Sequence, residues 1–360
     1  MKLLFVGTNR GGGGTESHFV TLAKAMRQQG HEVAAVVLAD APIHRGLQDS
    51  GVHIRTGTFR NALDPRGIRA VWRACSEFQP DWIVGSFSKE YWPLAVIGRL
   101  RGAKVALFKH MDFPLRPVTH FFIPRLAQRF IVISKFMRDN FIARGIAPAR
   151  IQILYNPLDL DYFRPDETLR ASSRAQFGFA EDDIVVGFVG ALHRDKGIFV
   201  LAEALHLAMA ELPALKALWV GEGPDGPALQ AHIQNGGYQG RHVCHGWSTD
   251  VRPYYAAMDI LAAPTLVTET FGRVSIEAQA SGVAVLCSDL GGLPETLEPD
   301  VTGKLLPVGD VTAWRDAIFK LAGDAQLRRE FQRNGRTWVN RKFGAAAIAA
   351  EFSRILAQAR

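Results

Sequence analysis

Two glutamates eight residues apart, Glu269 and Glu277, stand in the segment ETFGRVSIEAQASGVAV at 269–285. Glu269 follows an apolar segment, ILAAPTL, so we expect it in the loop beyond the end of a strand. Gly272 allows close backbone approach, and VSIEAQASG predicts a short helix with Glu277 in its first turns. A carboxylate and several free helix N-terminal amides would then face one ligand, which suits a molecule with both hydroxyls and phosphates.

The same spacing disfavours a glycosidase. Such enzymes hold two carboxyl groups about 5–10 Å apart across one bond. Eight helical residues already span roughly 12 Å.

A glycine run near the N-terminus is a second candidate. Gly11–Gly14, followed by Thr15 and Glu16, come after the apolar stretch KLLFV and before a helical pattern. Amides of Gly13 and Gly14 can approach a phosphate without obstruction by Cβ. No G-x4-G-K-[ST] run is present, which disfavours an ATP-cleaving phosphate loop. The alternative is a plain tight turn.

Two cations, Arg194 and Lys196, follow the apolar stretch DIVVGFVG. A cation at this place can neutralise charge that develops on a leaving diphosphate. The alternative for Lys196 is a solvated loop residue.

The segment GEGPDG at 221–226 satisfies G-x-G-x-x-G after a strand pattern, as in dinucleotide-binding oxidoreductases. Pro224, directly after Gly223, removes an amide that would face a pyrophosphate. The next strand pattern, RHVCHG, also ends without the acidic residue expected about 20 positions on. We therefore disfavour an oxidoreductase.

Composition indicates an ordinary soluble chain of two domains. The protein has 360 residues, 48% hydrophobic and 21% charged. Its three cysteines lie far apart, which predicts a reduced, metal-free protein. The opening MKLLFVG is too short for a signal-peptide core and predicts a strand instead. Nothing approaches the ~20 apolar residues of a membrane span.

Positive charge is concentrated in one segment. Eleven Lys and Arg against two acids lie between Arg99 and Arg150, whereas the whole chain carries only +7. Aromatic residues are interleaved, with Arg116, Arg125 and Arg129 flanking the apolar run HFFIP. We expect this basic segment to bind anionic lipid or a phosphorylated acceptor, and we expect these three arginines to make the membrane contact. The alternative is a solvated face with buried aromatics. Nucleic acid is disfavoured because no recognised nucleic-acid motif accompanies the charge.

The order of elements predicts an α/β protein with two Rossmann-like domains. Seven short apolar strand patterns lie in the first half and five more follow residue 183, mostly separated by helical stretches such as 16–30. Such alternation implies parallel sheets covered on both faces. We expect an N-terminal domain at 1–163, a C-terminal domain at 164–340 and a last helix at 341–360. Each domain begins with an apolar strand that runs into a glycine-containing loop, FVGTNRGGGG in the first and FVGALHRDKG in the second. Because ligands collect at the carboxyl ends of parallel strands, both of these loops should face one interdomain cleft.

The glutamate pair resembles the E-x7-E signature of the retaining group 1 glycosyltransferases. Further segments resemble that family's motifs in the same order along the chain: GTNRGGGGTE at 7–16, KHMD at 109–112, YNPLDLDYFRP at 155–165, GALHRDKG at 190–197, GEGPDGPAL at 221–229, and DLGGLPETL with VTGKLLP at 289–307. The resemblance implies a GT-B fold, with the last helix crossing back onto the first domain.

The resemblance also implies roles for individual residues. Glu277 would accept hydrogen bonds from ribose hydroxyls, and Glu269 would contact the transferred sugar. His110 and Lys196 would complete the catalytic set, while Glu16 and His110 would face the acceptor. The implied donor-binding residues are Gly13, Gly14, Arg194, Lys196, Gly223, Glu269, Phe271, Gly272, Arg273, Val274 and Glu277.

Two positions depart from the family pattern. Ala191 stands where the family usually has an arginine after Gly190, so either Arg194 takes over the phosphate contact or Lys196 works alone. Pro157 replaces the usual glycine after Asn156, in a segment that we interpret as interdomain turn chemistry.

The resemblance implies a metal-independent hexosyltransferase that needs no cofactor. It would move a hexose or hexosamine from a nucleoside-diphosphate sugar, UDP favoured over GDP, to a hydroxyl of a bacterial surface glycan or lipopolysaccharide-type acceptor. No Asp-x-Asp motif is present, and the eleven histidines are scattered in the sequence, so we expect no metal-ligand cluster. We expect a cytoplasmic protein associated peripherally with the inner face of the cytoplasmic membrane. An epimerase, a phosphorylase and a non-catalytic binding subunit remain alternatives.

Overall fold

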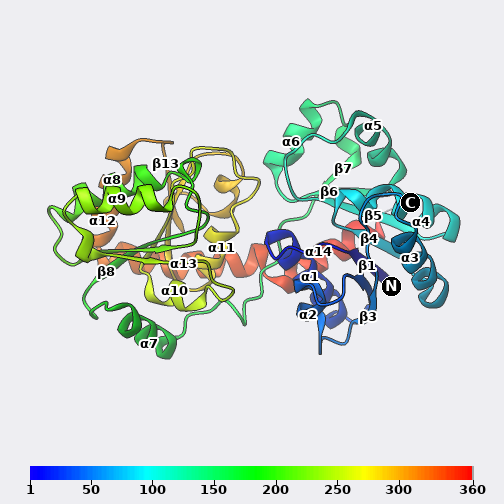
Figure 1. Cartoon of the computed structure of the whole chain (residues 1–360), viewed down its shortest axis with the longest axis horizontal. Coiled ribbons are helices and arrows are strands. Elements are labelled where there is room, and N and C mark those ends of the chain that lie inside the picture. Colours follow the sequence, from blue (N-terminus) through cyan, green and yellow to red (C-terminus); the bar gives the residue numbers. More distant parts are fainter. Residues whose placement is uncertain (359–360) are drawn as a thin grey trace. The chain divides into compact units, whose positions relative to one another are not determined.

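The computed structural model describes residues 1–358, which form two compact units. Unit 1 comprises Met1–Asp159 together with the chain from Phe343 on, and unit 2 comprises Leu160–Lys342. Each unit contains one sheet flanked by helices (Figure 1).

Unit 1 is built on a seven-stranded parallel sheet in the order β3-β2-β1-β4-β5-β6-β7. Its strands are β1 Lys2–Gly7, β2 Glu32–Val37, β3 His53–Thr56, β4 Trp82–Gly85, β5 Lys104–Lys109, β6 Arg129–Val132 and β7 Ile151–Ile153. Its helices are α1 Gly14–Gln28, α2 Pro42–Leu47, α3 Pro65–Phe78, α4 Tyr91–Arg101, α5 Pro117–Leu126, α6 Lys135–Ala143 and α14 Ala345–Ala357, with short 3-10 turns η1 Ser88–Glu90 and η2 Pro148–Arg150.

Unit 2 has a six-stranded parallel sheet in the order β10-β9-β8-β11-β12-β13. Its strands are β8 Ile184–Val189, β9 Leu215–Val220, β10 His242–His245, β11 Ile260–Ala263, β12 Ala284–Ser288 and β13 Gly303–Leu306. Its helices are α7 Glu167–Phe177, α8 Ile198–Met209, α9 Gly226–Asn235, α10 Arg252–Ala257, α11 Arg273–Ala280, α12 Val311–Gly323 and α13 Ala325–Phe343, with η3 Arg194–Lys196, η4 Gln239–Arg241 and η5 Leu293–Thr296.

The α/β fold with two parallel sheets is confirmed, and all twelve predicted strands are present. The thirteenth strand, β13, was not predicted as a strand. Its sequence GKLL begins with glycine and carries a lysine, so its four residues lack an uninterrupted apolar run. It forms because it adds to the edge of the sheet beside β12.

The unit bounds differ from the predicted domain bounds by only a few residues. The predicted domain bound at 163 compares with a unit boundary after Asp159, and the predicted start of the last segment at 341 compares with Phe343. Helix α14 packs in the core of unit 1, where the ring of Phe352 contacts that of Phe108 at 5.5 Å between centroids.

Candidate functional site

Loops after β8, β11 and β12 meet in unit 2 around Glu269. The β8 loop contacts the β11 loop because Leu266 N–H donates to Asp195 O at 2.8 Å. The β12 loop contacts it through Gly292 N–H, which donates to Glu269 O at 2.8 Å. A Cβ on Gly291 would lie 2.5 Å from Glu269 O, so only glycine permits this approach.

Lys196 and Glu269, two of the predicted catalytic residues, form an ion pair in this group of loops. Each side chain is about one-third exposed, so both charged groups remain accessible. The pair lies just ahead of α11, since Glu269 precedes the first residue of that helix by four positions. A cation and a carboxylate are therefore held together beside a helix N-terminus.

Gly272 begins α11 from the left-handed region, with φ +101°, and its missing Cβ leaves room for Leu293. The next amides, those of Arg273 and Val274, belong to the first turn, where N–H groups have no partner within the helix. Phe271 is buried, so its predicted donor contact can come only from its backbone. The segment supplies backbone donors rather than a side-chain pocket.

Glu277 lies in the second turn of α11 and already accepts two protein hydrogen bonds. Tyr255 OH donates to Oε2 at 3.1 Å and Arg273 Nε donates to Oε1 at 3.1 Å. Burial and the Glu277 carboxylate raise the pKa of Tyr255, which keeps this phenol protonated as a donor. These two partners orient the Glu277 carboxylate. Because each carboxylate oxygen can accept more than one hydrogen bond, Glu277 can also accept hydrogen bonds from ligand hydroxyls.

The two cations of the β8 loop have different neighbours. The Arg194 side chain is 68% exposed and donates to Asp225 at 3.1 Å, on the loop that precedes α9. This guanidinium lowers the pKa of the Asp225 carboxyl. Lys196 instead contacts Glu269. Which of these two cations makes the phosphate contact expected beside Ala191 stays a prediction.

Gly223 lies where the β9 loop crosses the β8 loop. A Cβ at this position would be 2.3 Å from Leu192 O. The neighbouring Glu222 accepts a hydrogen bond from Trp247 N–H at 3.2 Å, which joins this turn to an exposed indole. The turn and Trp247 form a candidate platform for a planar base.

In unit 1, His110 is buried after β5 and contacts a second histidine that the sequence analysis missed. The rings of His18 and His110 lie 4.7 Å apart, and His18 Nδ1 is 2.9 Å from Asn156 Oδ1. His18 is fully buried on α1, 138 positions from Asn156, so no local pattern could reveal the group.

Glu16, predicted to face the acceptor, holds the glycine loop together. Its carboxylate accepts hydrogen bonds from Gly13 N–H at 3.0 Å and from Asn9 Nδ2 at 2.6 Å. Gly13 is the N-cap of α1 and Gly14 its first residue. Glu16 therefore caps the N-terminus of α1, and its predicted contact with the acceptor substrate would compete with this capping role.

A buried carboxyl behind the same loop was also missed. Glu90 is fully buried, and its Oε1 accepts from Thr8 N–H at 2.8 Å and from Thr8 Oγ1 at 2.7 Å. In the part of the chain that the structure describes, its Oε2 has no hydrogen-bond partner. Burial raises the pKa of Glu90 to about 7.

The three arginines expected at a membrane surface do not share one environment. Arg116 and Arg125 are exposed at the two ends of α5, with Arg125 over the ring of Phe121. Arg129 is half-buried at the start of β6 and donates to Ile355 O at 2.8 Å. Arg129 is therefore corrected to a structural contact with α14.

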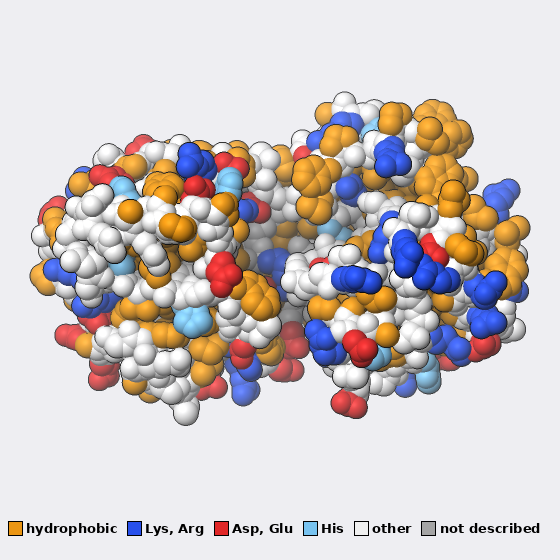
Figure 2. Space-filling view, in the orientation of Figure 1, with side chains coloured by type: hydrophobic (Ala, Val, Ile, Leu, Met, Phe, Trp, Pro, Cys, Tyr) orange, Lys and Arg blue, Asp and Glu red, His pale blue; other side chains and the backbone are white. Residues whose placement is uncertain are grey.

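The helices and loop near the other two arginines also carry exposed apolar side chains. Figure 2 shows hydrophobic and basic side chains gathered over the part of unit 1 that carries α4 and α5. We call this the α4–α5 patch; its exposed apolar members are Val96, Leu100, Met111, Phe113, Val118, Phe121, Phe122 and Leu126. Within residues 1–358, no helix is long and apolar enough to cross a membrane.

A cavity of about 630 Å³ in unit 1 includes Arg116, just before α5, in its lining. Arg60, Arg66 and Arg116 line it, together with the segment 61–65. Asp64 pairs with Arg66 at 3.0 Å, so the lining keeps a net positive charge. Such a cavity suits an anionic ligand.

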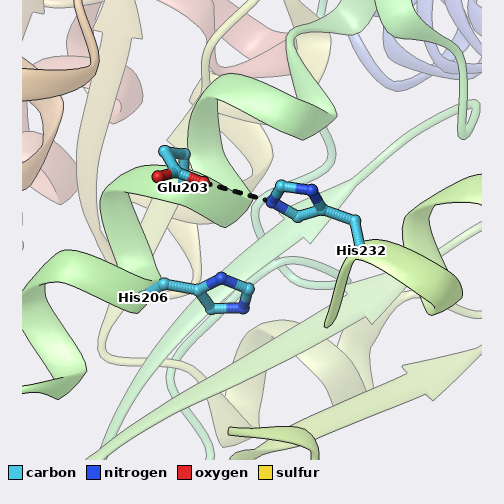
Figure 3. Close-up of side chains that lie close together, drawn as sticks. All are labelled: Glu203, His206 and His232. Atoms are coloured by element: carbon cyan, nitrogen blue, oxygen red, sulfur yellow. Dashed lines mark ion pairs between the residues drawn. The ribbon is translucent and has the colours of Figure 1, made fainter. Parts of the chain in front are cut away.

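The expectation that the histidines form no cluster is wrong for one group. Glu203 and His206 of α8 lie with His232 of α9 so that one ligand atom of each falls within 4.8 Å of the others (Figure 3). This group rests on helices rather than on the loops at strand ends that carry Lys196 and Glu269.

Comparisons with known families match both halves of the chain. Residues 12–162 match the model described as "Glycosyltransferase Family 4", and residues 183–324 match "Glycosyl transferases group 1". The chain is 37% identical over 204 residues to a D-inositol 3-phosphate glycosyltransferase of Mycobacteroides abscessus, covering 54% of this chain and 44% of that relative. The chain spans about half the length of the curated relatives it matches.

Solved structures share the fold over nearly the whole chain. Alr3699/HepE of Anabaena, in complex with UDP and glucose, superposes with a TM-score of 0.83 at 23% identity, covering 99% of each chain. A glycosyltransferase of Rickettsia africae superposes with a TM-score of 0.86 at 18% identity, covering 99% of this chain and 97% of the other. These likenesses confirm the GT-B fold.

Proposed function

Because the chain is built from a Glycosyltransferase Family 4 domain and a group 1 glycosyl transferase domain, we propose that it transfers a hexose or hexosamine from a UDP-sugar to a hydroxyl acceptor. The observation that carries the proposal is the Lys196–Glu269 pair held by three loops beside the start of α11. UDP is favoured because the similar HepE structure holds UDP and glucose.

The donor is bound by unit 2 in this proposal. Glu277 accepts hydrogen bonds from the ribose hydroxyls, and its orientation is fixed by Tyr255 and Arg273. Glu269 contacts hydroxyls of the sugar. Lys196 and the first amides of α11 neutralise the diphosphate as charge grows on it in the transition state, so no divalent cation is needed for catalysis.

Transfer proceeds with retention of the anomeric configuration. The motifs carry no obvious nucleophile for a double displacement. The leaving phosphate therefore helps to deprotonate the acceptor hydroxyl on the same face of the sugar.

The acceptor is bound by unit 1. The cavity lined by Arg60, Arg66 and Arg116 favours an acceptor with an anionic group. A phosphorylated acceptor agrees with this lining, and the similar relative acts on D-inositol 3-phosphate by its name. A lipopolysaccharide-type glycan supplies the same phosphate chemistry on a membrane.

The α4–α5 patch attaches the protein to the anionic inner face of the cytoplasmic membrane. Its aromatic residues insert at the interface while Arg116 and Arg125 contact lipid headgroups, each contributing on the order of 1 kcal/mol. Replacing both arginines with glutamate should abolish pelleting with anionic vesicles at low salt and leave UDP binding unchanged. Equal pelleting of variant and parent would remove the membrane role.

Measurement of UDP release from a panel of UDP-sugars tests the reaction. We expect release that depends on a phosphorylated acceptor, survives EDTA and gives a product with the donor's anomeric configuration by NMR. Sugar conversion without acceptor would indicate an epimerase, and dependence on inorganic phosphate a phosphorylase. Binding without turnover would indicate a non-catalytic subunit.

A further inference from the structure

Two adjacent helices of unit 2 present three metal-ligating side chains to one point. Glu203 and His206 are three residues apart on α8, a spacing that places them on the same face of a helix. His232 reaches them from α9, with its Nε2 3.4 Å from Glu203 Oε2. Figure 3 shows the two imidazole rings one above the other, with the carboxylate beside His232.

His206 is the buried member of this group. Its relative exposure is 9%, and its Nε2 has no hydrogen-bond partner among residues 1–358. An unsatisfied buried polar atom costs about 1–3 kcal/mol, so a structure that retains one needs an explanation. The ring packs closely against Gly236, where an added Cβ would lie 2.1 Å from it.

The His206 and His232 rings are stacked, with 5.3 Å between centroids and 8° between planes. Two protonated rings at this separation would repel each other. Neutral imidazole is the form that binds a metal ion.

A third histidine nearby, His242, is not a ligand. Its ring contacts that of His206, but Trp219 Nε1–H donates to its Nδ1 at 3.0 Å. Indole is only a donor, so the proton of neutral His242 is on Nε2 and blocks that atom. The donor set is therefore two imidazole nitrogens and one carboxylate oxygen.

We propose that Glu203, His206 and His232 form a binding site for one transition-metal ion of the Zn²⁺ class, with water as fourth ligand. Imidazole with carboxylate suits Zn²⁺, Co²⁺ and Ni²⁺, whereas Mg²⁺ and Ca²⁺ prefer oxygen ligands alone. Bonds of about 2.1 Å in a tetrahedral site place ligand atoms about 3.4 Å apart. The present separations of at most 4.8 Å close to this value by small side-chain rotations.

The ion would join the two helices that follow the candidate donor loops. Helix α8 begins directly after Lys196 and Gly197, and α9 begins at the end of the turn that contains Gly223. The site is therefore structural, separate from the metal-independent transfer proposed above, and its test does not depend on activity.

Calorimetric titration of Zn²⁺ into the untagged full chain, first dialysed against EDTA, tests the site. We expect one ion per chain, a raised Tm with Zn²⁺ but not with Mg²⁺, and visible bands of tetrahedral Co²⁺ when Co²⁺ is used. Glu203→Gln and His232→Ala should each weaken Zn²⁺ binding at least tenfold. Both residues are at least one-third exposed, so the variants should fold, which circular dichroism checks.

His53→Ala, on the exposed surface of β3 in unit 1, is the matched control and should bind Zn²⁺ like the parent. Two results would overturn the site. One is a parent that binds no Zn²⁺, and the other is a folded Glu203→Gln and His232→Ala pair that binds it with the parent's affinity and stoichiometry.

Discussion

The loops at strand ends in the two units use glycine for different reasons. In unit 2, Gly197 and Gly221 have positive φ, and a Cβ on either would lie 1.9 Å from a neighbouring carbonyl oxygen. In unit 1, Gly11 and Gly13 have no positive φ, and a Cβ on either would meet only ordinary contacts at 3.4–3.5 Å. The unit 2 glycines are required by the fold, whereas these two unit 1 glycines are not.

This difference separates two kinds of binding loop. Close backbone packing fixes the unit 2 loop, so it can present charged side chains such as Lys196 at a set position. The unit 1 loop is held by the Glu16 carboxylate, and its glycines carry no Cβ that would obstruct the phosphate contact proposed for this loop. Substitutions in the unit 2 loop should therefore change stability or turnover, whereas substitutions in the unit 1 loop should change ligand binding.

Lys196→Ala should give the largest effect on the reaction. Removing a cation that stabilises developing charge typically lowers kcat by about 10²–10³-fold, equivalent to about 3–4 kcal/mol. The KM for the donor should change far less, because the contact strengthens in the transition state. Steady-state kinetics measures this split. A rise in KM at constant kcat would assign Lys196 to ground-state binding only.

Gly197→Ala should destabilise unit 2 by about 3 kcal/mol, the sum of left-handed strain and overpacking against Pro264 O. Gly13→Ala should cost about 1 kcal/mol or less, because its φ of −144° suits alanine, yet it should weaken ligand binding at the unit 1 loop. Urea unfolding of both variants tests the contrast. Equal destabilisation would show that both loops need glycine for folding.

Glu90→Gln should change how the stability of unit 1 depends on pH, because Glu90 is the buried carboxyl that accepts hydrogen bonds from Thr8. The folded-state pKa of Glu90 is raised from 4.5 to about 7, so folding favours the protonated form. Its contribution to stability is full below about pH 4.5 and is lost as pH rises through 7, a fall of about 3 kcal/mol. The amide variant should lack this fall while keeping the acceptor for Thr8. Urea unfolding across this range gives the comparison, and parallel curves for parent and variant would contradict the buried charge.

Sequence patterns predicted the strands because buried parallel strands are apolar throughout, as in KLLFV and IVVGFV. Sequence patterns also predicted Lys196 and Glu269 near strand ends and Glu277 in the first turns of a helix. Neighbouring residues in the sequence are enough to indicate such positions. What they missed depends on distant residues. His18 meets His110 only through the fold, and the Glu203 cluster joins two helices, with His232 twenty-six positions from His206. In the sequence, Arg129 resembles its basic neighbours. Only the fold brings it to α14, where it donates a hydrogen bond to Ile355 O.

Calorimetric titration of UDP into the parent and Glu277→Ala tests the central claim, that the loops of unit 2 bind a nucleoside diphosphate. The parent should bind UDP without divalent metal, and Glu277→Ala should bind it at least tenfold more weakly. Urea unfolding must first show that the variant retains its fold, since Tyr255 and Arg273 lose a partner. His53→Ala should bind UDP like the parent. A folded Glu277→Ala variant with the parent's UDP affinity would contradict the account.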